Sequence, residues 1–217
     1  MQLLKQEINR KLLHLFALLM PVGIFYVPKI PGVSHFVPAI ILAFLLFGSV
    51  LIETLRFRYT TIQKIYFSCF GSMLRKEEEK ITTGSTYIIG AAFICSILFR
   101  NAPHISFMSL SLFILGDAVA ALIGQSLGRI KMGKKSLEGS LACFFLCLAM
   151  FSLFPQIPFL LDDWKGSVPI PLILIISFSI TFLELVPIKI TKKFTINDNL
   201  AVPVIAGIIM ERLYPFF

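Results

Sequence analysis

The segment from residue 116 to residue 140 holds the densest group of side chains that can do chemistry. An acid, Asp117, is followed at helical spacing by the small residues Ala120 and Gly124. A loop rich in glycine and basic residues comes next, with Gly128, Arg129, Lys131, Gly133, Lys134 and Lys135. Glycines let backbone N–H groups approach phosphates, and Lys and Arg neutralise phosphate charge. Because Mg²⁺ prefers one or two carboxylates together with phosphate oxygens, this segment is typical of a Mg²⁺–triphosphate site.

Three more acids, Glu53, Glu184 and Asp198, lie at or just inside the ends of apolar runs, as Asp117 does. A carboxylate in such a place is costly unless it is paired, solvated or bound to a cation. For Glu53 and Glu184 we favour an ion-paired or snorkelling side chain at a helix end. Asp198 stands between Asn197 and Asn199 and is instead a candidate metal ligand.

The elements that must hold these residues are long and apolar. The 217-residue chain is 57% hydrophobic and 15% charged, with a mean hydropathy of +0.86, whereas soluble domains are ~45–50% apolar and ~25% charged. A spanning helix needs ~20 residues, and seven apolar runs reach or approach this length: 12–27, 34–53, 84–99, 104–124, 139–161, 168–187 and 197–217. We therefore predict an all-α, polytopic membrane protein, one domain over residues 1–217, with about seven transmembrane helices. Pro203 and Gly207 could break the last one.

Residues 56–80 show a different pattern, with apolar residues at helical spacing along one face only. Such a helix is expected to lie along the membrane interface on the cytoplasmic side. Most of the 20 basic residues fall in the N-terminal segment and in 56–80, 129–135 and 189–193, all on one predicted side. The positive-inside bias then places the N-terminus and the four acids at the cytoplasmic face. Basic residues in short membrane loops argue against nucleic-acid binding, although the net charge is +8.

The central segment resembles the signature of the CTP-dependent lipid-alcohol kinases, which include dolichol kinase, phytol kinase and CTP-dependent diacylglycerol kinase. The family pattern is roughly G-D-x-x-A-x-x-x-G-x-x-x-G, a basic linker and K-S-x-E-G-S. The chain matches it at Gly116, Asp117, Ala120, Gly124, Gly128, Lys135, Ser136, Glu138, Gly139 and Ser140. A more distant similarity links this pattern to phosphatidate cytidylyltransferases.

Three shorter segments resemble further elements of the same family, in the same order. Arg10, Lys11 and His14 match its N-terminal R-K-x-x-H element. The R-x-x-E … T-G-x-T segment is matched by Arg75, Glu78, Thr83, Gly84 and Thr86. Residues 197–203 resemble its D-D-N-x-x-x-P element, with Asn197 in place of the first Asp. The resemblance thus covers nearly the whole chain.

The resemblance implies CTP as phosphoryl donor, Mg²⁺ as cofactor and a membrane lipid alcohol as acceptor: a polyprenol or dolichol, phytol or diacylglycerol. Expected catalytic residues are Asp117, Arg10, Lys11 and His14, and Asp117 and Asp198 are the expected metal ligands. Nucleotide binding is expected from Gly116, Ala120, Gly124, Gly128, Arg129, Lys134, Lys135, Ser136, Glu138, Gly139, Arg75, Glu78, Gly84, Thr86 and Asn199.

Two other functions stay open at this point. A CTP:phosphatidate cytidylyltransferase, which makes CDP-diacylglycerol, shares a related pattern, but its H-G-G … D-R-x-D segment has no counterpart after Asp198. A small cation-coupled transporter usually has an internal repeat and charges near the bilayer midplane, and the chain has neither pattern. We expect a multi-pass protein whose active site faces the cytoplasm, in the inner membrane of a bacterium or the endoplasmic reticulum of a eukaryote. The sequence does not indicate which lipid is the acceptor or what the oligomeric state is.

Overall fold

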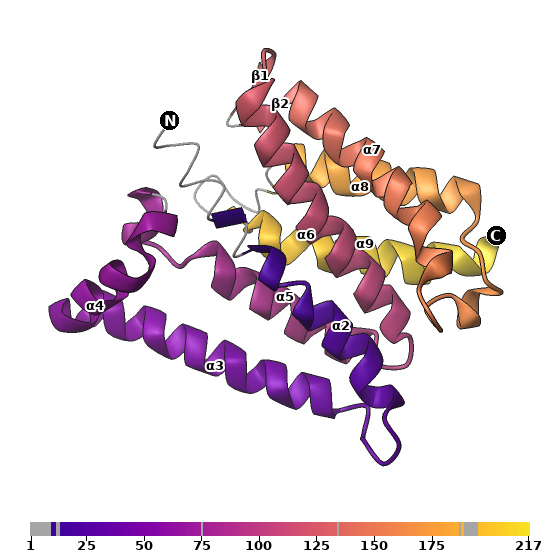
Figure 1. Ribbon diagram of the computed structural model, residues 1–217, viewed down its shortest axis with the longest axis horizontal. Coiled ribbons are helices and arrows are strands. Elements are labelled where there is room, and N and C mark those ends of the chain that lie inside the picture. The colour runs from indigo at the N-terminus through magenta and orange to yellow at the C-terminus, as the bar shows by residue number, and fades with distance from the viewer. Residues whose placement is uncertain (1–9, 12–13, 75, 134, 187, 189–194) are drawn as a thin grey trace.

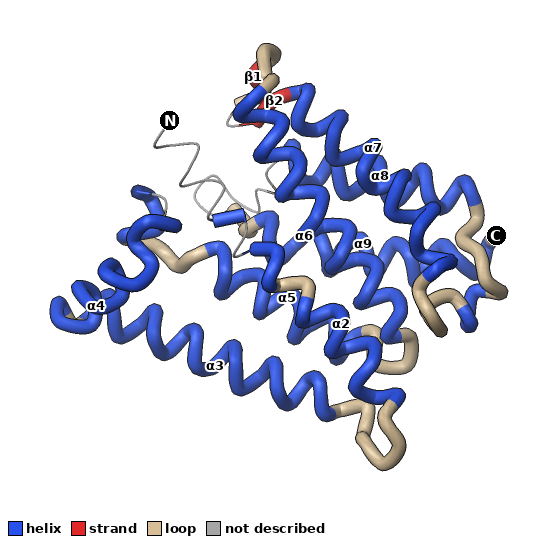
Figure 2. Tube along the Cα trace, in the orientation of Figure 1, coloured by secondary structure: helices blue, strands red, loops and turns tan. Residues whose placement is uncertain are grey.

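The computed structural model describes residues 10–11, 14–74, 76–133, 135–186, 188 and 195–217, and these residues are mostly helical (Figure 1). The helices are α2 (Leu19–Tyr26), α3 (Val37–Arg58), α4 (Thr60–Phe70), α5 (Gly84–Leu98), α6 (Pro103–Ser126), α7 (Leu137–Leu153), α8 (Ile170–Leu185) and α9 (Asp198–Leu213). Two short antiparallel strands, β1 (Lys131–Met132) and β2 (Lys135–Ser136), form a hairpin between α6 and α7 (Figure 2). The predicted helical architecture is therefore confirmed, with this hairpin as an addition.

Within the described residues, three helices are long and apolar enough to cross a membrane: α3, α6, and α7 with its continuation to Gln156. Shorter apolar helices cover His14–Lys29, α5 and α8. The 16 residues of α9 include Asp198, Asn199, Glu211 and Arg212, which lower its hydropathy. The structure supports a helical membrane protein, and the full set of seven spans stays a prediction.

Helix α6 lies at the centre of the molecule and packs against α2, α7 and α9 (Figure 1). It begins at Pro103, a residue suited to the first helical turn because its missing N–H would have no helical partner there. Residues 104–114 are all buried, including three serines. Ser106 Oγ donates a hydrogen bond to the Cys95 carbonyl at 3.0 Å, so α5 and α6 meet through a satisfied polar contact. The central helix therefore carries Asp117 out of the core toward its C-terminal end.

The segment after α3 differs in its boundaries from the predicted interfacial helix over 56–80. Helix α3 continues to Arg58, the chain is extended at Tyr59 (φ −122°, ψ 118°), and α4 runs over Thr60–Phe70. The boundary moves because Arg56 is buried at 1% exposure and pairs with Glu53 one turn earlier, inside α3. Helix α4 buries no residue and points away from the bundle (Figure 1). Its placement at a membrane interface stays a prediction.

Helix α9 is continuous through Pro203 and Gly207, so the break that these residues could have caused does not occur. A Cβ at Gly207 would lie 2.7 Å from Phe99 Cζ, which means that the aromatic ring occupies the space of a side chain. Both Phe99 and Val202 are buried in the core. This close contact packs α9 against the end of α5.

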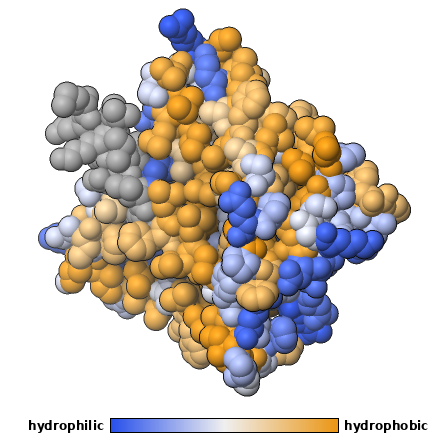
Figure 3. All heavy atoms as spheres, turned by 45° about the vertical axis from the view of Figure 1, so that its right-hand side comes forward, coloured by the Kyte–Doolittle hydropathy of each residue, from blue (hydrophilic) through white to orange (hydrophobic). Residues whose placement is uncertain are grey.

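Figure 3 shows one face of the molecule, which is largely hydrophobic, with hydrophilic residues gathered at the top, where Figure 1 places the β1–β2 hairpin, and toward the lower right. Many large apolar side chains are exposed along α3, among them Ile40, Ile41, Phe44, Leu45, Phe47, Val50, Leu51 and Ile52. Exposed apolar surface on this scale is expected where lipid tails are the solvent.

Candidate active site

A cavity of about 130 Å³ lies at the C-terminal end of α6, where the hairpin, the start of α7 and the end of α8 meet. Its lining residues are Asp117, Ala120, Ala121, Gly124, Gln125, Lys131, Lys135, Ser136, Gly139, Ser140 and Glu184. Most of them belong to the Gly116–Ser140 segment. The cavity thus joins the central acid of the motif to basic residues of the loop that follows it.

Asp117 is held by residues from the N-terminal segment. Lys11 Nζ donates to Asp117 Oδ2 at 2.5 Å, and His14 Nε2 lies 3.4 Å from the same oxygen. The Lys11 side chain is 5% exposed and that of Asp117 is 18% exposed. Arg10 is near enough to interact electrostatically with His14. Two segments more than 100 residues apart, which the sequence analysis identified separately, therefore meet at one carboxylate.

Lys135 ties the hairpin to α8 and α9. Its Nζ lies 2.9 Å from Glu184 Oε1 and 3.0 Å from Asp198 Oδ2, and it also donates to the backbone carbonyl of Glu184. Burial lowers the pKa of Lys135, but the carboxylates of Glu184 and Asp198 outweigh burial, and the net pKa is raised. Lys135 is therefore a cation at neutral pH, and it is close enough to Asp117 for their charges to interact.

Local hydrogen bonds fix the loop that carries these cations. Glu138, in the first turn of α7, accepts bonds from the backbone N–H groups of Arg129 (2.9 Å) and Ile130 (3.1 Å). Ser136 is the N-cap of α7, and its Oγ accepts from the Gly139 N–H at 3.2 Å. The hairpin turn contains Gly133 at φ +66°, a conformation that glycine adopts without strain. Glu138 thus shapes the loop, while Lys135 pairs with other acids.

Three glycines of the motif lie where the backbone is packed most closely. A Cβ at Gly124 would lie 2.8 Å from Ser136 Oγ, and one at Gly128 would lie 2.6 Å from the same oxygen. A Cβ at Gly139 would lie 2.5 Å from the Ala120 carbonyl oxygen. Side chains at these positions would displace Ser136 or separate α6 from α7. The glycine spacing therefore has a packing reason of its own, independent of phosphate binding.

A second polar cluster joins α3, α5 and α9 beside the cavity. Glu78 Oε1 accepts from the Gly84 N–H at 3.1 Å, and Asn199 Nδ2 donates to the Gly84 carbonyl at 3.0 Å. Thr86 Oγ1 lies 2.6 Å from Ser49 Oγ. Because Asn199 follows Asp198, this cluster fixes the start of α9 and with it the acid that Lys135 contacts.

A buried ion pair supports that cluster from α3. Arg56 Nε donates to Glu53 Oε2 at 2.6 Å, and Arg56 Nη2 donates to the carbonyls of Glu78 (2.9 Å) and Ile81 (2.7 Å). Glu53 Oε1 in turn accepts from the Thr83 N–H at 3.0 Å and from its Oγ1 at 2.6 Å. The ion-paired interpretation of Glu53 is confirmed. The pair holds residues 78–83 against α3.

The structure gathers most of the predicted site residues at one end of the bundle. Lys11, His14 and Asp117 form one group, and Lys135 with Asp198 forms a second. The nucleotide-binding residues predicted from the T-G-x-T and D-D-N elements join beside them through Gly84 and Asn199. Arg129 is exposed on the loop and does not line the cavity. Arg75 and Lys134 lie outside the described residues.

The expected Mg²⁺ can be tested against the donors present. Among the described residues, no three His, Cys, Asp or Glu side chains converge as an all-protein metal cage requires. Mg²⁺ needs only one or two carboxylates when phosphates supply other oxygens. Asp117 and Asp198 are partly exposed carboxylates that now face lysines, so the donor set fits a metal that arrives with a nucleotide.

Glu184, Glu53 and Arg56 are not among the site residues predicted from the sequence. Glu184 was interpreted only as an ion-paired or snorkelling acid, and the pairing with Lys135 confirms that much. Its signal was an acid at the end of an apolar run on the same predicted side as Asp117 and Asp198. Nothing in the sequence indicated that Arg56 is buried, because an arginine near the end of a membrane helix is usually exposed at the membrane surface.

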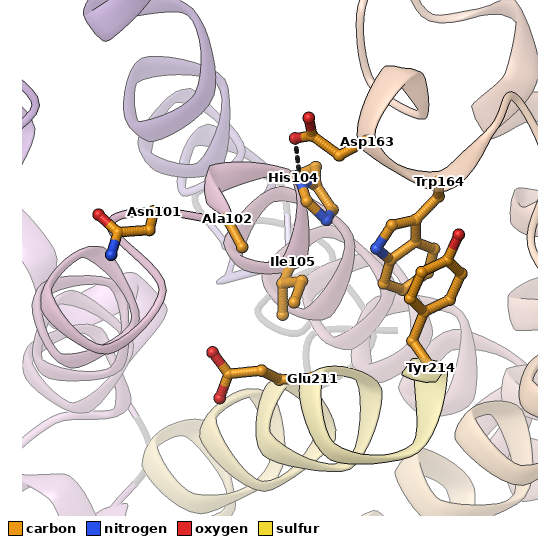
Figure 4. A pocket seen from close by; sticks show the side chains of 8 residues that line it. All are labelled: Asn101, Ala102, His104, Ile105, Asp163, Trp164, Glu211 and Tyr214. Carbon is orange, nitrogen blue, oxygen red and sulfur yellow. Dashed lines mark ion pairs between the residues drawn. The ribbon is translucent and has the colours of Figure 1, made fainter. Parts of the chain in front are cut away.

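A larger cavity, about 270 Å³, lies near the other end of α6 (Figure 4). It is lined by Asn101, Ala102, His104, Ile105, Asp163, Trp164, Glu211 and Tyr214. His104 Nδ1 lies 3.1 Å from Asp163 Oδ2, and the rings of Trp164 and Tyr214 stack at 4.2 Å between centroids. Among the described residues, two acids and no Lys or Arg line this cavity, so it would repel a triphosphate. We therefore place the candidate site at the smaller cavity.

Comparison with known proteins gives distant relatives. The chain is 29% identical over 218 residues to an uncharacterized protein of Rickettsia prowazekii, covering 97% of this chain and 95% of that protein. It is 24% identical over 225 residues to a probable chloroplastic phytol kinase of Triticum aestivum, covering 98% of this chain and 69% of that protein. It is 28% identical over 131 residues to a probable chloroplastic phytol kinase 1 of Glycine max, covering 57% of this chain and 41% of that protein.

No family model matches the chain, and no solved structure matches it either. The relatives whose names state a function are phytol kinases, which supports a lipid kinase family for this chain. The match to the Triticum aestivum protein includes nearly all of the chain, so it includes both the Asp117 segment and the Asp198 segment.

Proposed function

We propose that this protein transfers the γ-phosphoryl group of CTP to the hydroxyl of a membrane lipid alcohol, with phytol as the first candidate acceptor. The observation that carries the proposal is the meeting of Lys11, Asp117 and Lys135 with Asp198 at one end of an apolar helical bundle. Relatives named phytol kinases support an alcohol with an apolar tail as acceptor. CTP as donor rests on the resemblance to the CTP-dependent lipid-alcohol kinases.

The residues around the cavity have separate tasks in this proposal. Asp117 and Asp198 would hold Mg²⁺, which would neutralise phosphate charge. Lys11 and Lys135 would bind phosphate oxygens, with Arg10 and Arg129 supplying further positive charge from the same end of the bundle. Phosphoryl transfer depends mostly on positioning and charge stabilisation, so such a set supplies most of what the reaction needs.

His14 is the candidate residue for the acceptor hydroxyl. Its Nε2 faces Asp117 Oδ2 at 3.4 Å, which would orient the imidazole and leave Nδ1 to accept the hydroxyl proton. The alcohol oxygen then forms a bond to the γ-phosphorus, the bond from that phosphorus to the β-phosphate oxygen breaks, and CDP leaves. The cavity lies at one end of a long apolar helix, so a hydroxyl at the membrane interface would reach it while the apolar tail stays in lipid.

The proposal is tested by incubating the purified protein with Mg²⁺, a lipid alcohol and CTP that carries label at either the γ- or the α-phosphate. The panel of acceptors is phytol, a polyprenol, diacylglycerol and phosphatidate, and ATP and GTP serve as alternative donors. We expect γ-label in a lipid monophosphate, with an equal amount of CDP, and no reaction with phosphatidate.

The same experiment separates the competing chemistry. A cytidylyltransferase would move α-label into phosphatidate and release pyrophosphate, because the lipid phosphate attacks the α-phosphorus. That result would replace the kinase proposal. Transfer from ATP in preference to CTP would keep the kinase and reject the proposed donor.

A further inference from the structure

Glu184 is buried at the candidate site but has no task in the proposed reaction. It belongs to the last turn of α8, its side chain is 4% exposed, and it lines the cavity together with Asp117. Oε1 contacts Lys135 Nζ at 2.9 Å. Oε2 is also buried, and among the described residues it has no hydrogen-bond partner. A buried carboxylate oxygen without a partner is energetically costly. The ion pair with Lys135 does not satisfy this oxygen, so we look for a ligand that does.

The surroundings of the Lys135 ammonium resemble a cation site. Three oxygens lie within hydrogen-bond distance of Nζ: Glu184 Oε1, the Glu184 backbone carbonyl and Asp198 Oδ2. An ammonium has three N–H donors, so these oxygens satisfy all of them. Two carboxylates and a carbonyl are also the oxygen donors that hard divalent cations prefer. The Lys135 ammonium therefore occupies a position that a divalent metal ion, which prefers the same oxygen ligands, could take.

The charges of the cluster favour such an exchange when a nucleotide binds. Asp117, Glu184 and Asp198 carry negative charge, and the ammonium groups of Lys11 and Lys135 contact them. A triphosphate adds several more negative charges to the same cavity. If a divalent cation replaces an ammonium between the carboxylates, the lysine is released to bind phosphate, and every charge keeps an opposite neighbour.

We propose that Glu184 is a further metal-ligating residue and that Lys135 occupies the cation position of Glu184 and Asp198 until a divalent cation takes it. This inference rests on the proposed function for the identity of the nucleotide. It does not require three convergent acids, because two carboxylates and phosphate oxygens suffice for Mg²⁺. Glu184 Oε2 gains a partner in the exchange, and Lys135 moves from the carboxylates to the phosphates.

The test measures binding of Mn²⁺ alone, by electron paramagnetic resonance of the free ion, without nucleotide or lipid. Removing the ammonium in Lys135→Met should tighten Mn²⁺ binding by at least about tenfold relative to the unchanged protein, because a competing cation is gone. The matched control is Lys131→Met, which removes an exposed lysine of the same cavity whose ammonium donates to the Gly124 carbonyl at 3.3 Å. The double variant Lys135→Met/Glu184→Gln should lose the gain.

Equal tightening in Lys135→Met and Lys131→Met would overturn the inference, since it would reflect only the loss of one positive charge. A gain that survives Glu184→Gln would overturn the assignment of Glu184. Lys135→Gln replaces the methionine variant if that protein elutes as an aggregate, because the amide can still donate to the Glu184 carbonyl. The readout involves no phosphoryl transfer, so a wrong donor or acceptor in the proposed function leaves its result unaffected.

Discussion

Arg56 and Glu53 illustrate what a charged residue requires inside an apolar bundle. Their side chains are 1% and 5% exposed. Arg56 Nη2 donates to the backbone carbonyls of Glu78 and Ile81, and Glu53 Oε1 accepts from the Thr83 N–H. The guanidinium also lies over the rings of Phe57 and Tyr66, at 4.4 Å and 4.7 Å from the centroids. Such a pair adds little to stability as a whole, but losing one partner leaves the other charge buried and alone.

Arg56→Met should therefore destabilise the protein strongly, by about 3–5 kcal/mol, because Glu53 would keep a buried charge without a counter-ion. The measurement is unfolding of the detergent-solubilised protein by heat or denaturant. Arg58→Met is the matched control, since Arg58 is exposed two residues further along α3. Equal losses in the two variants would show that the Glu53 pair does not matter.

The residues of the site could be predicted only in part from the sequence. Asp117, Lys135 and Asp198 stand in recognisable motifs, whereas their partners are set by contacts across 49 to 106 residues. Spacing along the chain carries no information about which lysine faces which acid. Glu184 was missed as a site residue for the same reason. It reaches the site because α8 packs against α7 and α9, and its neighbours in sequence do not indicate this.

At the scale of elements, the junction of α6, the hairpin and α7 is the most closely packed part of the site. Ser136 both caps α7 and fills the space beside Gly124 and Gly128. Helix boundaries followed the predicted runs closely for α5, which covers Gly84–Leu98. The run predicted over 139–161 instead gives a helix that ends at Leu153, because Pro155 removes a backbone donor.

Gly124→Ala should lower the melting temperature, since its Cβ would meet Ser136 Oγ at 2.8 Å and disturb the cap of α7. Loss of an N-cap costs about 1 kcal/mol. Gly48→Ala is the control within α3, where a Cβ meets nothing within 4 Å, and it should stabilise the helix by roughly 0.5–1 kcal/mol. Adding Ser136→Gly to Gly124→Ala should relieve the clash but not restore the cap. If Gly124→Ala and Gly48→Ala change the melting temperature alike, the packing explanation is wrong.

The contact between α4 and α3 predicts a dependence of stability on pH. Burial, followed by the negative charge of Glu53, raises the pKa of Tyr66 above its usual 10.0. Above pH 10 the unfolded chain ionises this phenol while the folded protein still keeps it protonated, so stability is lost as pH rises. Tyr66→Phe keeps the ring over Arg56 and should lose less stability between about pH 9 and about pH 11. Parallel melting curves of the two proteins across that range would contradict the assignment.

Across the whole molecule, an apolar bundle separates two cavities of opposite character. The cavity at the C-terminal end of α6 has lysines and acids in contact, and the one near its N-terminal end has acids, a histidine and stacked aromatic rings. Composition alone predicted the helical membrane protein, because few other structures can accommodate such an excess of apolar residues. It could not settle the number of spans, since α2, α5, α8 and α9 are shorter than a spanning helix usually is.

The proposed topology puts the hairpin end of the bundle in the cytoplasm, where most basic residues lie. In a variant without native cysteines, Lys165→Cys should react with an impermeant thiol reagent in intact cells, and Lys131→Cys should react only after the cells are opened. Lys131 and Lys165 are both exposed in the structure, so accessibility does not bias the comparison. Labelling of Lys131→Cys in intact cells would contradict this topology and place the hairpin end of the bundle outside the cell.

The most direct test of the account is whether phosphoryl transfer depends on the cavity at the Asp117 end. Transfer of γ-label from CTP to the lipid alcohol is measured for Asp117→Asn and for Glu211→Gln, an exposed acid at the other cavity. Asp117→Asn should reduce transfer by more than about 100-fold, because a carboxylate that holds a catalytic metal contributes several kcal/mol to the transition state. Glu211→Gln should leave transfer near that of the unchanged protein, and both variants should elute as folded protein. Transfer by Asp117→Asn within about tenfold of the unchanged protein, a difference of only ~1.4 kcal/mol, would contradict the placement of the site.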